Sequence, residues 1–227
     1  MLANIFLQAV SNVVDSAAIV VPKEDSLSLL QLIMKGGFIM IPVGILSVIS
    51  IYVFIERFAT IKKARKMDSN LMNVVKDNLM KGNLDAARSA CRASSSPAAL
   101  MIDKGISRLG KSTKEIESAM ESVGKLEIAK LEKNTNVLGV IAGIAPMMGF
   151  IGTVSGVIKI FYNISLADNI SIGLISGGLY EKMITSAAGL VVGVFSFICF
   201  HYLQAMIDRV SFVMEKSALE FMDIISE

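Results

Sequence analysis

Three stretches of the chain contain no Asp, Glu, Lys or Arg and consist mainly of apolar residues. They cover residues 36–55, 134–158 and 183–207, and they are 20, 25 and 25 residues long. A helix needs about 20 apolar residues to cross the hydrocarbon core of a bilayer. We therefore predict three transmembrane helices, because three such stretches in 227 residues argue against a soluble protein.

Between the first two stretches, apolar residues recur at steps of three and four, as at Leu71, Val75 and Leu79. This spacing is typical of amphipathic helices, and the residues from Ser112 to Glu115 are typical of a helix N-terminus. We expect a small helical bundle here. We also expect its last helix, from residue 113, to run without a break into the second transmembrane helix.

The first 30 residues have apolar side chains at helical spacing but no basic residue before Lys23, and Asp15 interrupts them. A cleaved signal peptide normally begins with basic residues. We therefore prefer an amphipathic helix that lies on the outer membrane surface, while processing of the N-terminus stays open.

These patterns predict an all-α integral membrane protein with three transmembrane helices. Long helices extend from the membrane into a cytoplasmic helical bundle, and an amphipathic helix precedes the first span. The expected order is the external or interfacial amphipathic segment (1–30), transmembrane helix 1 (31–56), the cytoplasmic helical domain (57–134), transmembrane helix 2 (135–162), an external turn (163–177), transmembrane helix 3 (178–204) and a cytoplasmic C-terminal helix (205–227).

The distribution of charge predicts the orientation of the chain. Of the 22 Lys and Arg residues, 16 lie between Arg57 and Lys133, whereas residues 161–177 have none. Positively charged segments beside transmembrane helices stay in the cytoplasm. The N-terminus and the turn are therefore predicted to lie outside, and the long loop and the C-terminus in the cytoplasm.

Few residues offer chemistry of another kind. The chain has one His and two Cys, Cys91 and Cys199, which are far apart in the sequence and form no CxxC motif. Such a set predicts neither a disulfide nor a metal site, and no nucleophile and base recur in a pattern typical of an enzyme. We therefore predict no enzyme activity, no cofactor and no nucleic-acid partner, and the lipid bilayer as a certain partner.

The second predicted transmembrane helix carries small residues on one face. At 100° per residue they occupy an arc of roughly 120°. The arc holds Ala142, Ala145, Pro146, Gly149, Gly152, Thr153 and Gly156, with Ile160 as its bulky member. Small residues let another helix approach closely, so a packing seam is one interpretation. Thr153 is the polar side chain in this face, and an ion path is the other interpretation.

The third predicted transmembrane helix gathers its polar side chains in an arc of roughly 140°. The arc holds Glu181, Lys182, Thr185, Ser186, Gly189, Gly193 and Ser196, with Val192 as its bulky member. An ionisable group inside a membrane costs about 2.5–3.5 kcal/mol and usually marks a pathway or a partner. A packing seam explains the glycines but not the charges and hydroxyls. The alternative is that Glu181 and Lys182 lie at the outer interface, near the start of the helix.

Residues 145–156 (APMMGFIGTVSG) and 178–190 (GLYEKMITSAAGL) resemble the second-span and third-span signatures of the MotA/TolQ/ExbB proton-channel family. Gly36 and Gly37, leading to the charge pair Glu56–Arg57, resemble its first span, and the three-span layout favours the ExbB/TolQ branch. The resemblance implies a motor subunit of the bacterial inner membrane with a periplasmic N-terminus. Five copies would enclose two helices of a single-span ExbD- or TolR-like partner. The proton-motive force would then energise a TonB-like periplasmic protein for outer-membrane transport.

The resemblance also implies an ion path and a pore face. The path residues are Thr153, Thr185, Ser186 and Glu181, and the pore-face residues are Ala145, Pro146, Gly149, Gly152, Gly156, Gly189 and Gly193. Hydroxyls cannot carry a proton at neutral pH, so the partner is expected to supply a membrane Asp. Lys182 departs from the family pattern. Its charge partner would come from a neighbouring subunit or the partner helix, because adjacent residues do not face each other on a helix.

Other interpretations stay open at this level. A TolQ-like, gliding-type or sodium-driven motor subunit would have the same pattern. So would a structural membrane assembly protein without ion coupling, whose small-residue faces merely close an oligomer. The sequence does not set the coupling ion, the cargo or the exact stoichiometry.

Overall fold

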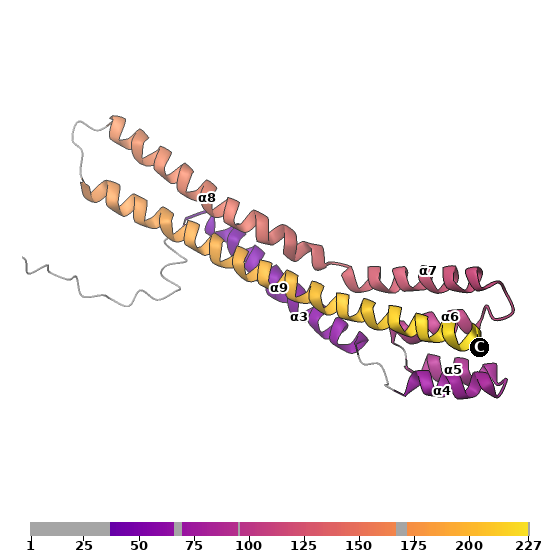
Figure 1. The fold of residues 1–227 in the computed structure, drawn as a ribbon. Helices are drawn as coiled ribbons and strands as arrows, with labels where there is room; N and C mark the ends of the chain where they lie inside the picture. The colour runs from indigo at the N-terminus through magenta and orange to yellow at the C-terminus, as the bar shows by residue number, and fades with distance from the viewer. Residues whose placement is uncertain (1–36, 66–69, 95, 167–171, 227) are drawn as a thin grey trace, which may run out of the picture. The chain divides into compact units, whose positions relative to one another are not determined.

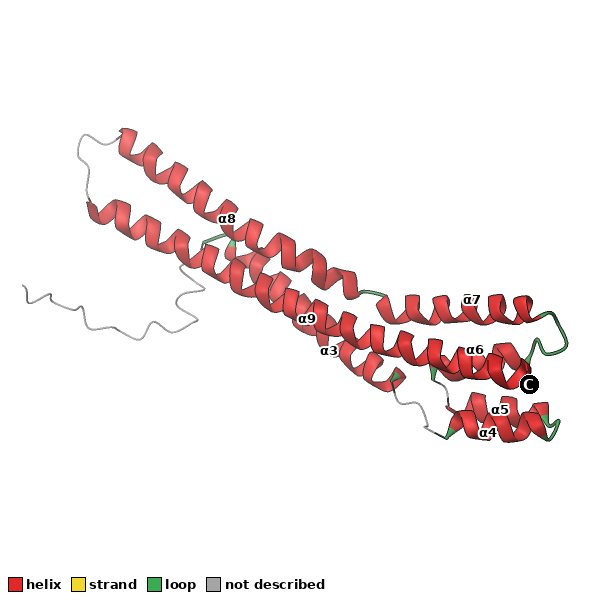
Figure 2. Cartoon of the chain, viewed as in Figure 1, coloured by secondary structure: helices red, strands yellow, loops and turns green. Residues whose placement is uncertain are grey.

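The computed structural model describes residues 37–65, 70–94, 96–166 and 172–226, apart from the side chains of residues 172, 174 and 181. The predicted N-terminal amphipathic helix lies outside these residues. Every regular element in the described part is a helix (Figure 1; Figure 2). The helices are α3 (Met40–Ala64), α4 (Leu71–Met80), α5 (Leu84–Ser94), α6 (Pro97–Ile106), α7 (Thr113–Glu132), α8 (Thr135–Leu166) and α9 (Ile172–Ser226).

Helices α3, α8 and α9 are each long and apolar enough to cross a membrane. This confirms the predicted all-α membrane protein with three spans. Large apolar side chains on these helices stay exposed in the single chain, including Val48 at 68%, Tyr52 at 67% and Val191 at 69%. Apolar surface of this extent is typical of a membrane or protein contact.

Helix α9 is a single element of 55 residues. The predicted third transmembrane helix and the predicted C-terminal helix are therefore one continuous helix. Figure 1 shows α9 alongside α8 over its first part and alongside α7 over its last part. One helix thus connects the apolar spans to the bundle of short helices.

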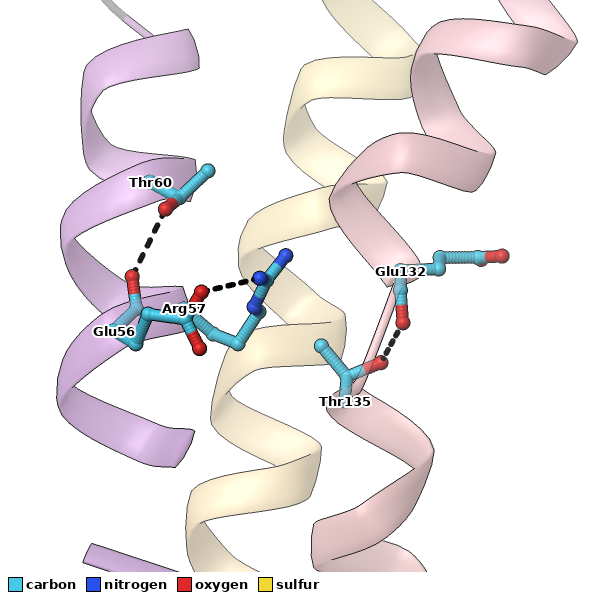
Figure 3. Close-up of polar contacts among 5 residues, drawn as sticks. All are labelled: Glu56, Arg57, Thr60, Glu132 and Thr135. Atoms are coloured by element: carbon cyan, nitrogen blue, oxygen red, sulfur yellow. Dashed lines mark hydrogen bonds and ion pairs between the residues drawn. The ribbon is translucent and has the colours of Figure 1, made fainter. Parts of the chain in front are cut away.

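The expectation of an unbroken helix from residue 113 into the second span is wrong. Lys133 leaves the helical conformation with ψ at 130°, and Asn134 has a φ of 65°. Asn tolerates this left-handed conformation better than most residues because its short polar side chain can bond locally. The hydroxyl of Thr135 then donates to the carbonyl oxygen of Glu132 at 2.7 Å, which occupies an acceptor at the end of α7 (Figure 3).

Helices α4 to α7 pack around the last part of α9 through side chains. Phe221 of α9 is fully buried with Met120 and Ile102 in this core. A methyl group on Gly105 would lie 2.7 Å from both Sδ of Met120 and Cε1 of Phe221, so these side chains would have to move to accept it. The bundle is therefore predicted to depend on a few large side chains that fill its centre.

The ends of these helices have local stabilising contacts. Ser96 accepts a hydrogen bond from the backbone N–H of Ala99, and Pro97 occupies the first helical position. Ser112 accepts from the N–H of Glu115 and donates to its carboxylate, which confirms the helix start predicted there. Substituting such capping residues typically costs about 1 kcal/mol.

Candidate ion path

Helices α8 and α9 approach each other so closely that backbone meets backbone. A methyl group on Gly189 would lie 2.6 Å from the carbonyl oxygen of Ala145, and one on Gly149 would lie 3.1 Å from Cα of Ser186. No side chain fits at these points without a shift of the helices. We call this contact the α8–α9 seam. Its members are Ala142, Ala145, Pro146, Gly149, Gly152 and Gly156 on α8, and Lys182, Thr185, Ser186, Gly189 and Gly193 on α9.

The seam brings together the two small-residue faces that the sequence predicts. Gly193 makes room for the ring of Pro146, since a methyl group there would lie 2.5 Å from the proline Cγ. Pro146 itself lies inside α8, where it removes one backbone hydrogen bond. For the glycines, the packing interpretation is therefore sufficient.

The other end of the seam holds the polar residues of α9. Thr185 is fully buried, and its Cγ2 would lie 3.0 Å from a methyl group on Gly152. A methyl group on Gly156 would overlap the aliphatic stem of Lys182, which is half-buried. The lysine thus covers apolar helix surface with its methylene groups, as long cationic side chains often do.

Two predicted path residues are less buried than Thr185: Thr153 lies beside the seam, and Ser186 contributes its backbone to the seam. Thr153 is half-buried and its hydroxyl donates to the carbonyl oxygen of Phe150 at 2.7 Å. It lies about one helical turn from Gly149, and Gly149 contacts the backbone of the half-buried Ser186. The structure therefore places Thr153, Thr185 and Ser186 near one another. Glu181 belongs to α9, but its side chain is not among those described.

Sequence reasoning missed a polar contact of the first span. The hydroxyl oxygens of Ser50 and Ser196 are 2.8 Å apart, and both residues are fully buried. Ser196 also donates to the carbonyl oxygen of Val192 at 2.8 Å, so Ser50 donates to Ser196. Two serines in the first span, Ser47 and Ser50, were too few for a polar face to be predicted there, although Ser196 was already part of the predicted polar face of the third span. The contact fixes α3 against α9.

The charge pair at the end of the first span is also more buried than an interfacial pair would be. Arg57 Nη2 lies 2.5 Å from a carboxylate oxygen of Glu56, and the Arg57 side chain is 10% exposed. Figure 3 shows its guanidinium extending toward the α7–α8 junction that carries Glu132 and Thr135. Its buried Nε has no hydrogen-bond partner in the described structure. A buried donor without a partner is costly, so Arg57 is an incompletely compensated polar group in this part of the fold.

The polar side chains in the α8–α9 seam are hydroxyls and the Lys182 ammonium, and His201 lies farther along α9. Residues 134–158 and 183–207 contain no Asp or Glu, and the described residues contain no cluster of three or more His, Cys, Asp or Glu side chains. Hydroxyl groups donate and accept hydrogen bonds but stay protonated at neutral pH. The hydroxyls beside the seam can guide a hydrated ion or an acidic side chain, but they cannot themselves take up a proton.

Residues 93–216 match the model of the MotA/TolQ/ExbB proton channel family, which is more than half of the chain. The chain is 25% identical over 181 residues to biopolymer transport protein ExbB-like 1 of Synechocystis sp., which covers 78% of this chain and 71% of the relative. It is 26% identical to the biopolymer transport protein ExbB homolog of Methanothermobacter thermautotrophicus, over 80% of this chain and 64% of the relative.

A shorter match of 92 residues is 26% identical to the Tol-Pal system protein TolQ of Haemophilus influenzae, over 40% of each chain. The family model covers α6 to α8 and most of α9, and therefore includes the whole α8–α9 seam. The family consists of proton channels rather than enzymes, as the sequence predicts. With its three apolar spans and glycine seam, the chain belongs to the MotA/TolQ/ExbB proton channel family.

Proposed function

We propose that this chain is the ion-channel and stator subunit of an ExbB-type motor in the bacterial inner membrane. It uses the proton-motive force to energise a TonB-like periplasmic protein for outer-membrane transport. The names of the two longest-matching relatives, both biopolymer transport proteins, support this assignment. The observation that carries it is the pair of half-buried hydroxyls, Thr153 and Ser186, beside a seam in which backbone meets backbone at Gly149 and Gly189.

The close contact between α8 and α9 limits where the ion path can run. Because α8 and α9 leave no space between them at Gly149 and Gly189, an ion cannot pass through the seam itself. It passes along the outer edge, where Thr153 and Ser186 offer hydroxyl groups. Thr185 is buried in the seam and acts by holding the two helices together, while Glu181 lies nearer the external end of α9.

The carrier of the proton is supplied by a second protein. Residues 134–158 and 183–207 contain no carboxylate, and His201 lies on α9 beyond the α8–α9 seam, whereas a proton relay within a membrane normally depends on Asp, Glu or His. We assign this role to an Asp in the transmembrane helix of a single-span ExbD- or TolR-like partner. Five copies of the present chain surround two such helices, and Lys182 pairs with an acid of a neighbouring subunit or of the partner.

The free energy released by ion flow across the membrane is large enough to drive such a motor. One elementary charge that crosses 100 mV releases about 2.3 kcal/mol, which is comparable with the cost of rearranging a few helix contacts. The excess of basic residues between Arg57 and Lys133 supports a cytoplasmic location for α4 to α7. The N-terminus and the α8–α9 turn then lie in the periplasm.

The test is substitution at the edge of the seam in cells that depend on the system. We expect Thr153→Ala and Ser186→Ala to reduce partner-dependent uptake at normal membrane levels. Ser155→Ala is the matched control, because Ser155 is an exposed hydroxyl on α8 outside the seam. Full activity of both edge variants would reject the assigned path, and function that survives an uncoupler would favour a structural assembly protein.

A further inference from the structure

Helices α7 and α9 leave a groove between them that runs from Glu117 to Glu132 along α7. It has a volume of about 650 Å³, and Met120, Met214 and Met222 contribute to its apolar lining. Methionine side chains are flexible and polarizable, and they adapt to the shape of a bound partner. Such a groove is typical of a surface that receives an apolar side chain of another polypeptide.

The rim of the groove is acidic. It carries Glu117, Glu121, Glu132 and Glu215 but only one basic residue, Lys125. The Lys125 ammonium is 2.6 Å from the Glu121 carboxylate, so it offsets one of these four charges. The groove therefore favours an occupant that combines an apolar anchor with positive charge.

A second surface of the same chain has these two properties. Phe212 of α9 is 67% exposed, and it lies in a shallow depression with Arg65, Arg209, Val213 and Asp208. We call this surface the arginine–phenylalanine edge. Aromatic and arginine side chains are the ones that most often anchor protein interfaces. Its single acid leaves a net positive charge.

The groove and the edge use different positions of α9. Met214 and Glu215 face the groove, whereas Arg209 and Phe212 belong to the edge. One chain can therefore present its edge to one neighbour and its groove to another. Contacts between two different surfaces of identical chains produce closed rings when the rotation closes.

We propose that the α7–α9 groove receives the arginine–phenylalanine edge of a second copy of this chain. Phe212 of one copy inserts among the methionines of the next, and Arg209 approaches the acidic rim. This inference rests on the proposed function, since it supplies the contact by which the cytoplasmic parts of the subunits assemble. It also predicts that the ring persists beyond the membrane.

Cysteine cross-linking in membranes tests the contact directly. In a ring, equivalent residues lie at the same height, and Glu132 is the rim carboxylate at about the height of Arg209. We expect the full chain with Glu132→Cys and Arg209→Cys to form a ladder of disulfide-linked dimers and larger species on a denaturing gel. The native Cys91 and Cys199 are buried and provide little background. The control pairs Glu132→Cys with Asp85→Cys, an exposed position on α5, and should give no ladder.

Charge reversal provides the second measurement. Glu132→Lys and Arg209→Glu should each lower the oligomeric fraction several-fold, and the double variant should recover it. Native mass spectrometry of the wild type separates the outcomes. An oligomer without cross-linking or charge rescue overturns the interface alone, whereas a monomer overturns the assembly in the proposed function as well. A cross-link from Glu132→Cys to a different protein would assign the groove to that protein and overturn the proposal.

Discussion

The α8–α9 seam and the bundle of α4 to α7 are stabilised in opposite ways. In the seam, glycine allows two backbones to touch, and the space available for a side chain is nil at Gly149 and Gly189. In the bundle, Phe221, Met120 and Ile102 fill the interior with side-chain volume. The seam therefore fails when an atom is added, and the bundle fails when atoms are removed.

The difference follows from the surroundings of the two regions. Water drives apolar side chains into the bundle, whereas lipid provides no such driving force between transmembrane helices. Helices in lipid associate through close packing and hydrogen bonds, which small residues and buried hydroxyls supply. Four substitutions or conditions test this comparison.

The largest effect is expected at the centre of the bundle. Phe221→Ala removes a fully buried ring, and such a change costs about 3–5 kcal/mol. The variant should unfold at lower temperature in detergent, as measured by circular dichroism. Leu219→Ala is the control because Leu219 is 69% exposed on the same helix. Equal losses in the two variants would contradict the assignment of the bundle core.

The buried thiol of Cys91 makes the stability of the bundle depend on pH. Burial and, to a smaller extent, the nearby Asp103 carboxylate together raise the pKa of the Cys91 thiol to about 11. The raised pKa means that the folded state retains the proton between pH 9 and 11 while the unfolded state loses it. Stability is therefore complete below pH 9 and falls by about 2–3 kcal/mol as the pH rises through that range.

The measurement is the unfolding midpoint of the wild type and of Cys91→Ala as a function of pH. The wild type should lose stability above pH 9 more steeply than the variant. Native Cys91 should also react with iodoacetamide far more slowly than a free thiol at pH 8. Parallel pH curves for the two proteins would show that folding does not raise the pKa of Cys91.

The seam should respond to a single added methyl group. In Gly189→Ala, the new Cβ meets the carbonyl oxygen of Ala145 at 2.6 Å, and overpacking of this kind costs about 1–3 kcal/mol. We expect reduced activity and faster unfolding. Gly143→Ala on α8 is the matched control, because nothing lies within 4 Å of the added methyl group. If Gly189→Ala changed neither activity nor the rate of unfolding, α8 and α9 would be farther apart at this point than the described contact.

The smallest effect concerns the contact between Ser50 and Ser196. Hydrogen bonds between transmembrane helices contribute about 0.6 kcal/mol on average. A double-mutant cycle of Ser50→Ala and Ser196→Ala should recover a coupling of that size in thermal unfolding. Ser47→Ala provides a comparison within α3. Strict additivity of the two substitutions would show that the hydroxyls do not bond to each other.

Sequence periodicity was sufficient for the spans and for the faces of α8 and α9. The signals there are long and repetitive, because each turn of helix contributes one small or polar residue to the same arc. The positions of Thr153 and Ser186 relative to each other follow once two antiparallel helices are joined at these faces. The sequence did not indicate that Thr185 would be buried while its neighbour Ser186 stays half-buried.

Features that depend on one residue or on distant segments were not predictable. The end of α7 depends on the left-handed conformation of Asn134, which competes with a strong helical pattern on both sides. The contact of Ser50 joins residues 146 positions apart, and no local pattern encodes it. The methionine groove likewise exists only after α7 is placed against α9, since neither helix forms it alone.

The contrast between the uninterrupted α9 and the interrupted α7–α8 pair has a mechanical consequence. At 1.5 Å per residue, the 55 residues of α9 form a rod of about 80 Å. In the proposed motor, we expect a twist at the membrane end of α9 to reach the far end of the bundle, because α9 is continuous over Ile172–Ser226. The break at Lys133 and Asn134 between α7 and α8 should absorb such a twist. Relative movement of α7 and α9 is therefore expected to appear first at this break.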